Sequence, residues 1–139
     1  MANSNVVVNL TISDVDLLTN APALAIRQIV GATFPASQVL YDGYVTTPGA
    51  SQLTLVSAKI CGVVFLRHAG NADALLIILT PTGGSAAVYQ VAPQGFLLYF
   101  TPTVVAPPGS SANTNSITTV VIQSLQTTIF PTEVFIAQA

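Results

Sequence analysis

The residues best suited to acid–base chemistry stand close together in the middle of the chain. His68 is the one histidine of the sequence, Arg67 precedes it, and Asp73 follows five residues later. An imidazole beside a carboxylate is the arrangement of a general base and the group that orients it. A small hydrolase or isomerase would also need a cleft and a nucleophile, and the sequence identifies no nucleophile. We therefore interpret these residues as a turn stabilised by polar side chains, and we predict no catalytic residue and no enzymatic activity.

Carboxylates or a thiolate could instead bind a metal ion. Asp14 and Asp16 are two residues apart, as at the start of a calcium-binding loop. Such a loop needs further oxygen ligands and a bidentate glutamate at its end, whereas apolar residues follow here. Cys61, the one cysteine, lies among apolar residues and has no second cysteine for a disulfide or a zinc cluster. We predict no metal and no cofactor, and we expect Cys61 to be a small buried side chain.

Aromatic side chains leave carbohydrate binding open as an alternative. The chain has no tryptophan and four tyrosines. Tyr41, Asp42 and Tyr44 are the local candidates for a pocket in which aromatic and carboxylate groups converge. A receptor- or glycan-binding module would use such a pocket, so these three residues are the ones to locate in the structure.

Charge is scarce along the whole sequence. Charged residues make up 6% of the chain, against about a quarter in typical domains. Residues 74–132 carry no charge, yet the longest apolar run, Ala74 to Leu79, is far shorter than the roughly 18 residues of a membrane helix. The polarity comes from 16 Thr, 10 Ser, 8 Gln and 7 Asn, which can hydrogen-bond across a contact without the cost of burying charge. This composition predicts a stable symmetric homo-oligomer, with neither nucleic acid nor a membrane as a partner.

Short apolar runs separated by turn residues predict an all-β chain. Asp42-Gly43 between two such runs predicts a hairpin with a type I′ turn, and residues 23–30 fit a strand or a short helix. The regular spacing indicates one β-sandwich or barrel domain over residues 1–139, with a long uncharged loop at about residues 105–116. The runs that predict strands are residues 6–12, 39–41, 44–46, 52–56, 61–67, 74–79, 87–92, 96–100, 117–125 and 127–136. Residues 74–79 do not alternate, so we expect this strand to be buried on both faces.

The run at residues 96–100 is apolar or aromatic at every position, so we expect it to be buried on both faces. Alternation places Phe96, Leu98 and Phe100 on one face and Leu97 and Tyr99 on the other. We assign the first face to the core of the sandwich. We assign Leu97 and Tyr99 to an oligomer interface, because a phenol suits a boundary where its hydroxyl finds a partner.

Two segments of the second half carry a family resemblance. Residues 63–72 form a strand that ends in a Gly-Asn turn, and residues 88–95 form a strand that ends in a Pro-x-Gly turn before the next strand at Phe96. This order resembles small β-sandwich structural proteins of tailed bacteriophages, including capsid decoration (cement) proteins and some tail or fibre components. The resemblance covers roughly residues 50–139, where Glu133 to Ala137 fits the last strand. It implies a jelly-roll-like sandwich, symmetric oligomerisation and no catalysis.

We therefore expect a non-enzymatic virion structural protein that oligomerises, as a trimer, and decorates or cements a phage capsid. Its partners would be further copies of itself and the major capsid protein or another virion protein. The alternative is a receptor- or glycan-binding β-sandwich module of a tail or fibre. Residues 1–5 lack the charged and apolar segments of a secretory signal, so we expect synthesis in the host cytoplasm and a final location in the virion.

Overall fold

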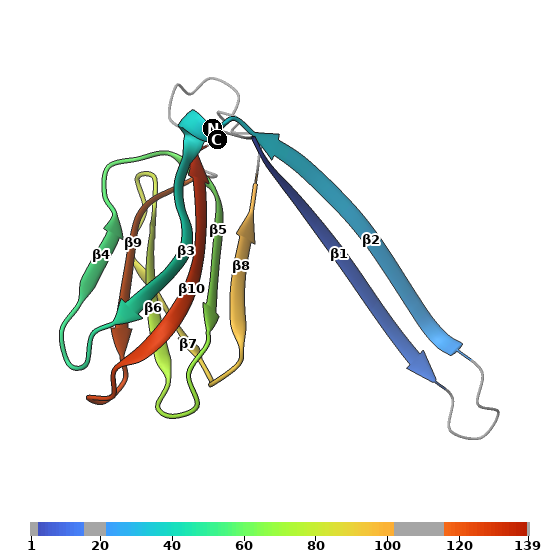
Figure 1. Cartoon of the computed structure of the whole chain (residues 1–139). Helices are drawn as coiled ribbons and strands as arrows, with labels where there is room; N and C mark the ends of the chain where they lie inside the picture. The colour runs from blue at the N-terminus through green and yellow to red at the C-terminus, as the bar shows by residue number, and fades with distance from the viewer. Residues whose placement is uncertain (1–2, 16–21, 102–115, 139) are drawn as a thin grey trace. The chain divides into compact units, whose positions relative to one another are not determined.

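The chain divides into two compact units, residues 1–36 and residues 37–139, in a computed structural model (Figure 1). The structure describes residues 3–15, 22–101 and 116–138, and for residues 12–15 and 22–28 it describes the backbone alone. The sandwich expected over residues 1–139 is built by the second unit. The predicted loop at residues 105–116 lies outside the described residues except for its last position.

The first unit is a two-stranded antiparallel ribbon, called here the N-terminal ribbon. Strand β1 (Ser4–Val15) pairs with β2 (Pro22–Phe34) in a continuous register that runs from Ser4 opposite Phe34 to Asp14 opposite Leu24. The predicted strand at residues 6–12 is confirmed. Residues 23–30, which left a strand or a helix open, belong to the strand β2, where β-branched side chains suit the pleated backbone.

Eight strands make up the described part of the second unit. A short 3₁₀ turn (Ala36–Gln38) leads into the first of them. The strands are β3 (Val39–Thr47), β4 (Leu53–Val56), β5 (Cys61–His68), β6 (Leu75–Pro81), β7 (Ala87–Val91), β8 (Phe96–Phe100), β9 (Ile117–Ser124) and β10 (Phe130–Gln138).

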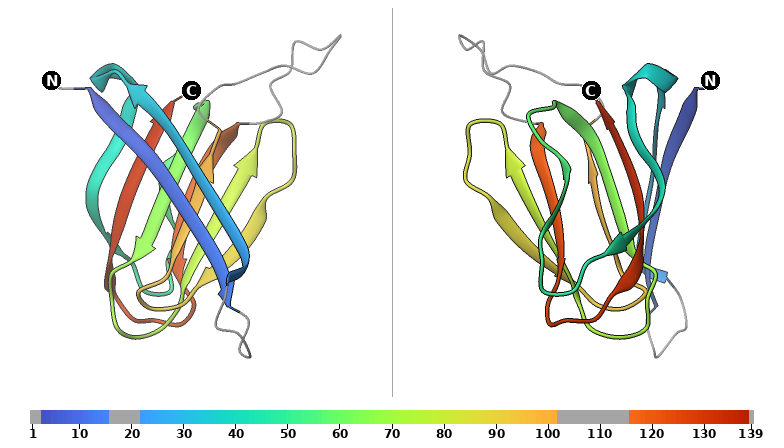
Figure 2. Two further views of the ribbon diagram at one scale, coloured as in Figure 1. Left: turned by 90° about the vertical axis from the view of Figure 1, so that its right-hand side faces the viewer. Right: turned by 60° about the vertical axis from the view of Figure 1, so that its left-hand side comes forward.

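These strands form a β-sandwich with jelly-roll topology, as Figure 2 shows from two further sides. One layer has the strand order β3-β10-β5-β8 and the other β4-β9-β6-β7, and all pairings are antiparallel. A bridge between Cys61 and Ile117 joins β5 to β9 at one corner. Strands from both ends of the unit alternate within each layer, which is the double Greek key of a jelly roll. The predicted all-β sandwich is therefore confirmed.

The core lies between the two layers and is aliphatic. Each layer turns every second residue inward, so alternate positions of β5, β6, β9 and β10 are buried. No helix able to cross a membrane occurs among residues 3–15, 22–101 and 116–138. The fully buried core side chains include Val64, Leu66, Leu75, Ile77, Val120, Ile122 and Ile136.

Two details of the predicted strands are wrong. Asp42-Gly43 forms no hairpin, because β3 continues straight through it and pairs with β10, with Gly43 opposite Val134. Gly43 has φ 145°, a positive value that L side chains rarely adopt and glycine tolerates, and the strand passes through it without a turn. In β6, which was expected to be buried on both faces, Leu75 is buried but its neighbour Leu76 is partly exposed.

Candidate interaction surface

His68 and Asp73 are close in space, but their side chains do not form a base and its orienter. The His68 ring is fully buried and stacks on Phe130 with 3.9 Å between ring centroids. Its Nδ1 accepts a hydrogen bond from the backbone N–H of Gly70 at 3.0 Å, so Nε2 carries the proton and donates to the backbone carbonyl of Asp73 at 3.2 Å. Both ring nitrogens are therefore used to hold the turn after β5.

The Asp73 carboxylate also supports this turn. Its two oxygens accept hydrogen bonds from the backbone N–H groups of Ala74 at 2.8 Å and Gln126 at 3.0 Å. The carboxylate thus links the start of β6 to the segment after β9. The interpretation of residues 68–73 as a turn stabilised by polar side chains agrees with this geometry.

Cys61 is buried and unpaired at the start of β5. Burial raises the pKa of its thiol to about 11, because the charged thiolate would lose its water. A thiol in this state packs as a small apolar group, as the sequence predicted. Of the two aspartates weighed as the start of a calcium loop, Asp16 and the side chain of Asp14 lie outside what the structure describes. Among the described residues, no group of three or more His, Cys, Asp and Glu side chains could hold a metal ion.

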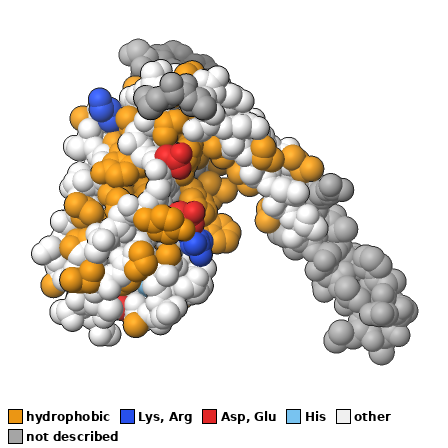
Figure 3. All heavy atoms as spheres, in the orientation of Figure 1, with side chains coloured by type: hydrophobic (Ala, Val, Ile, Leu, Met, Phe, Trp, Pro, Cys, Tyr) orange, Lys and Arg blue, Asp and Glu red, His pale blue; other side chains and the backbone are white. Residues whose placement is uncertain are grey.

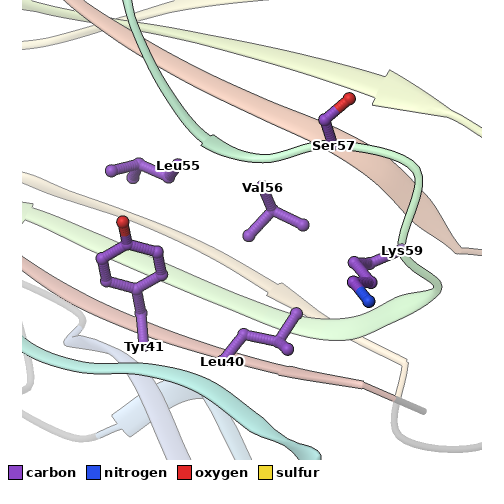
Figure 4. Close-up of a pocket in the computed structure, with 6 residues that line it drawn as sticks. All are labelled: Leu40, Tyr41, Leu55, Val56, Ser57 and Lys59. Atoms are coloured by element: carbon purple, nitrogen blue, oxygen red, sulfur yellow. The ribbon is translucent and has the colours of Figure 1, made fainter.

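Tyr41, Asp42 and Tyr44 do not converge on one pocket. They follow one another on β3, so alternation turns Tyr41 toward the core and the other two toward solvent. Tyr41 instead lines an open pocket of about 200 Å³ between β3 and β4, where Lys59 supplies the charged group (Figure 4). This volume is below the roughly 300 Å³ at which small-molecule sites begin. The other lining residues are Leu40, Leu55, Val56 and Ser57.

The faces of β8 are the reverse of the predicted ones. Leu97 lies opposite Leu66 of β5 and Tyr99 lies opposite Val64, and both pack against the core cluster. Phe96, expected in the core, is 64% exposed. When a strand is apolar at every position, its sequence pattern does not show which side chains face the core. For β8, the register with β5 determines the inner face. The predicted oligomer contact of Leu97 and Tyr99 stays a prediction, and it would use side chains that already face the core.

The outer face of the layer β3-β10-β5-β8 carries an unusual set of side chains. Two neighbouring rows cross all four strands, and we call this surface the aromatic face. The first row is Tyr44, Glu133, Arg67 and Phe96, and the second is Asp42, Phe135, Phe65 and Leu98. Figure 3 looks onto this face, where orange hydrophobic side chains surround a few acidic and basic ones.

Large apolar groups on the aromatic face are open to solvent. Tyr44 and Phe96, at the two ends of the first row, are each 64% exposed. The Phe96 ring contacts that of Phe65 with 6.1 Å between centroids, while Phe65 and Phe135 are partly exposed. Monomeric soluble proteins seldom leave aromatic groups gathered in this way, and such patches mark contact sites.

An ion pair stands between the aromatic rings. Arg67 Nε lies 2.7 Å from Glu133 Oε2, and both side chains are about one-third exposed, 34% and 35%. The hydrogen bond to Glu133 raises the pKa of Arg67 above its ordinary value, and Tyr44 acts more weakly in the same direction. Because the pair is neutral as a unit, covering it costs less than covering a lone charge.

The outer face of the other layer is different in kind. We call it the aliphatic face. Its side chains are uncharged, with Val88 63% exposed and opposite Ile78 of β6. The apolar side chains lie among Thr and Gln residues of the same rows. Across the strands, this face presents Thr54, Leu76, Ile78, Thr80, Val88, Gln90, Thr119, Val121 and Gln123.

A simple signal in the sequence could have found the aromatic face. Three strands place a charged residue two positions from an aromatic one: Asp42 with Tyr44, Phe65 with Arg67, and Glu133 with Phe135. A charged residue in a sandwich strand faces solvent, and residues two apart share a face. Each aromatic partner is therefore also directed outward.

Comparison of the chain with protein-family models, with curated proteins and with solved structures finds no match.

Proposed function

We propose that this chain is a non-enzymatic structural protein that self-associates, as a trimer, and decorates or cements the capsid of a tailed bacteriophage. The observation that carries this proposal is the aromatic face. Its exposed rings surround the Arg67–Glu133 ion pair, with Asp42 in the neighbouring row, and exposed aromatic groups around paired charge are suited to contact with another protein. The scarcity of charge in the rest of the chain supports the same proposal.

A subunit of this kind acts through contact area repeated around a shell. It binds the assembled lattice and not the free capsid subunit, so that binding stabilises the lattice by mass action. The jelly roll supports this role, because it presents a flat outer face on each of its two layers and is a common architecture of virion proteins. The resemblance of residues 50–139 to phage structural proteins points to the same class.

The alternative is a glycan- or receptor-binding module. Of its three candidate residues, Tyr44 and Asp42 still share one outer face. They share the aromatic face, with Tyr44 exposed, but Tyr41 faces the other way. A glycan array with the full-length protein tests this alternative. Specific binding that Tyr44→Ala abolishes, without any change in the mass of the oligomer, would favour it over the structural role.

The direct test of the proposal is an inventory of purified phage particles by mass spectrometry. Trypsin would not cut within residues 68–139, because they contain no Lys or Arg, so chymotrypsin is the better protease. We expect hundreds of copies in each particle. A few copies would indicate a tail or fibre component instead, and the absence of the chain from the particles would contradict the virion role.

A matched pair of variants tests the aromatic face itself. Phe96 and Val88 have nearly equal exposure, 64% and 63%, on opposite layers of the sandwich. We expect Phe96→Asp to remove attachment to particles stripped of the protein, and Val88→Asp to retain it. Equal attachment of both variants would show that the aromatic face is not the contact surface.

A further inference from the structure

We propose that the N-terminal ribbon is an association arm, whose two faces are covered by the ribbons of other copies of the chain. The ribbon forms a compact unit of its own that contains two strands. Two-stranded ribbons are marginally stable in water, and a third strand or a second layer is needed for independent stability. The structure of this unit therefore requires a partner.

Both faces of the ribbon expose large apolar side chains. Val8 and Val30 lie opposite each other, so they share a face with Leu10, and Leu10 is 50% exposed. On the other face Val7 and Ile29 are 58% and 54% exposed. The face of Val8 is thus mainly apolar, whereas the face of Val7 mixes exposed apolar side chains with Asn and Thr. Covering one face alone would leave the other in water.

The charge pattern of the ribbon favours a copy of itself as the partner. Charge in the two strands is confined to Asp14 and Arg27, one acid and one base, and residues 3–11 and 29–34 contain no charged side chain. The ribbon therefore has no excess of positive charge to attract nucleic acid. Asn5, Asn9 and Thr33 add uncharged hydrogen-bonding groups to the face that holds Val7. A surface of apolar and uncharged polar groups can contact an identical surface without charge repulsion. The ribbon can therefore pack against the ribbon of another copy.

The area of the ribbon is sufficient for a stable contact. Twelve residues at about 3.4 Å each make a ribbon about 40 Å long, and two strands make it about 10 Å wide. Each face then covers roughly 400 Å², and the two faces together roughly 800 Å². Stable protein interfaces bury about 800 Å² on each partner. The ribbon alone can thus hold copies together.

This inference rests on the proposed self-association and names the element that produces it. The test is hydrogen exchange of the full-length protein at several concentrations, with its mass measured in parallel. We expect the amides of β1 and β2 to lose protection on dilution, in step with dissociation, while those of β5 and β10 stay protected. Ribbon amides that stay protected in the dissociated monomer, or that lack protection in the oligomer, would overturn the inference.

A pair of variants provides the second readout. Val7→Asp should weaken association by roughly tenfold or more, because it buries an unpaired carboxylate at the contact. Val88→Asp, at an exposed valine of the sandwich, should leave association unchanged. Circular dichroism would verify that each variant folds. An oligomer that survives Val7→Asp would overturn the role of the ribbon and leave the proposed function standing, whereas a monomeric wild-type protein would contradict both.

Discussion

The ribbon and the sandwich are built from similar strands but differ in what covers them. Both are rich in β-branched residues and poor in charge. In the sandwich, Leu66 and Ile122 lie between two layers and have no exposed surface. In the ribbon, Val7 and Leu10 are at least half exposed. Strands of this kind are stable within one chain when a second layer buries their apolar side chains. Where no second layer is present, stability requires a partner that covers them.

This contrast separates two reasons for a low charge content. Within the sandwich core, charge is absent because burial without a partner is costly. On the ribbon and on the two outer faces, solvent would tolerate charge, and yet the aliphatic face has none and the aromatic face holds Arg67 and Glu133 as a pair. The large apolar side chains that stay exposed on the ribbon and on the aromatic face are therefore the feature that points to association.

The largest expected effect compares two leucines. Leu66 is fully buried in the sandwich and Leu10 is half exposed on the ribbon. Leu66→Ala should lower the free energy of unfolding by about 2–5 kcal/mol, through the loss of apolar contacts and the cavity that it leaves. Leu10→Ala should cost less than about 1 kcal/mol in dilute protein, because its side chain buries little surface there. Urea unfolding measures both. Equal costs would mean that the ribbon has a core of its own.

A pH titration sharpens the contrast further, because residues 3–11 and 29–38 contain no titratable side chain. The pKa of Cys61 rises from 9.0 to about 11 in the folded chain. As pH rises, the unfolded chain releases the Cys61 proton before the folded chain does. The contribution of Cys61 to the free energy of unfolding is therefore complete below pH 9 and declines between pH 9 and 11. The loss amounts to about 3 kcal/mol, since each pKa unit corresponds to about 1.4 kcal/mol. In Cys61→Ala this part of the pH dependence should be missing, and its persistence would contradict the assignment.

Two glycines give the smallest of the three effects. A Cβ at Gly70 would lie 2.6 Å from Phe130 Cβ and 2.9 Å from the His68 ring, so Gly70→Ala must displace the turn after β5. We expect a cost of about 1–3 kcal/mol, as for other overpacked sites. A Cβ at Gly31 of the ribbon would make ordinary contacts at 3.5 Å and 3.7 Å. Thermal unfolding should show Gly31→Ala to be neutral or slightly stabilising, and a loss as large as that of Gly70→Ala would indicate close packing over the ribbon.

The sequence alone predicted the fold class, the position of most strands and the burial of Cys61. These features follow from local alternation, turn residues and the apolar neighbours of one side chain. The path of β3 through Gly43 was not predictable, since Asp-Gly suits a hairpin until pairing with β10 decides otherwise. For the same reason, the inner face of β8 depended on its register with β5.

The candidate surface was harder to predict than the fold. The aromatic face combines four strands that are distant in sequence, and its rows exist only once β10 lies between β3 and β5. The pairs Phe65 with Arg67 and Glu133 with Phe135 pointed outward, but no local pattern placed them side by side. The boundary of the ribbon at Ala36 was also not predicted.

Self-association of the full-length chain is the central claim, and its mass in solution is the most direct test. Light scattering coupled to size exclusion, with the protein at micromolar concentration, measures this mass without any assumption about the partner. The account predicts one discrete species at a whole-number multiple of 14.3 kDa, and a trimer in particular. A soluble species that keeps a mass of 14.3 kDa at every concentration would contradict it.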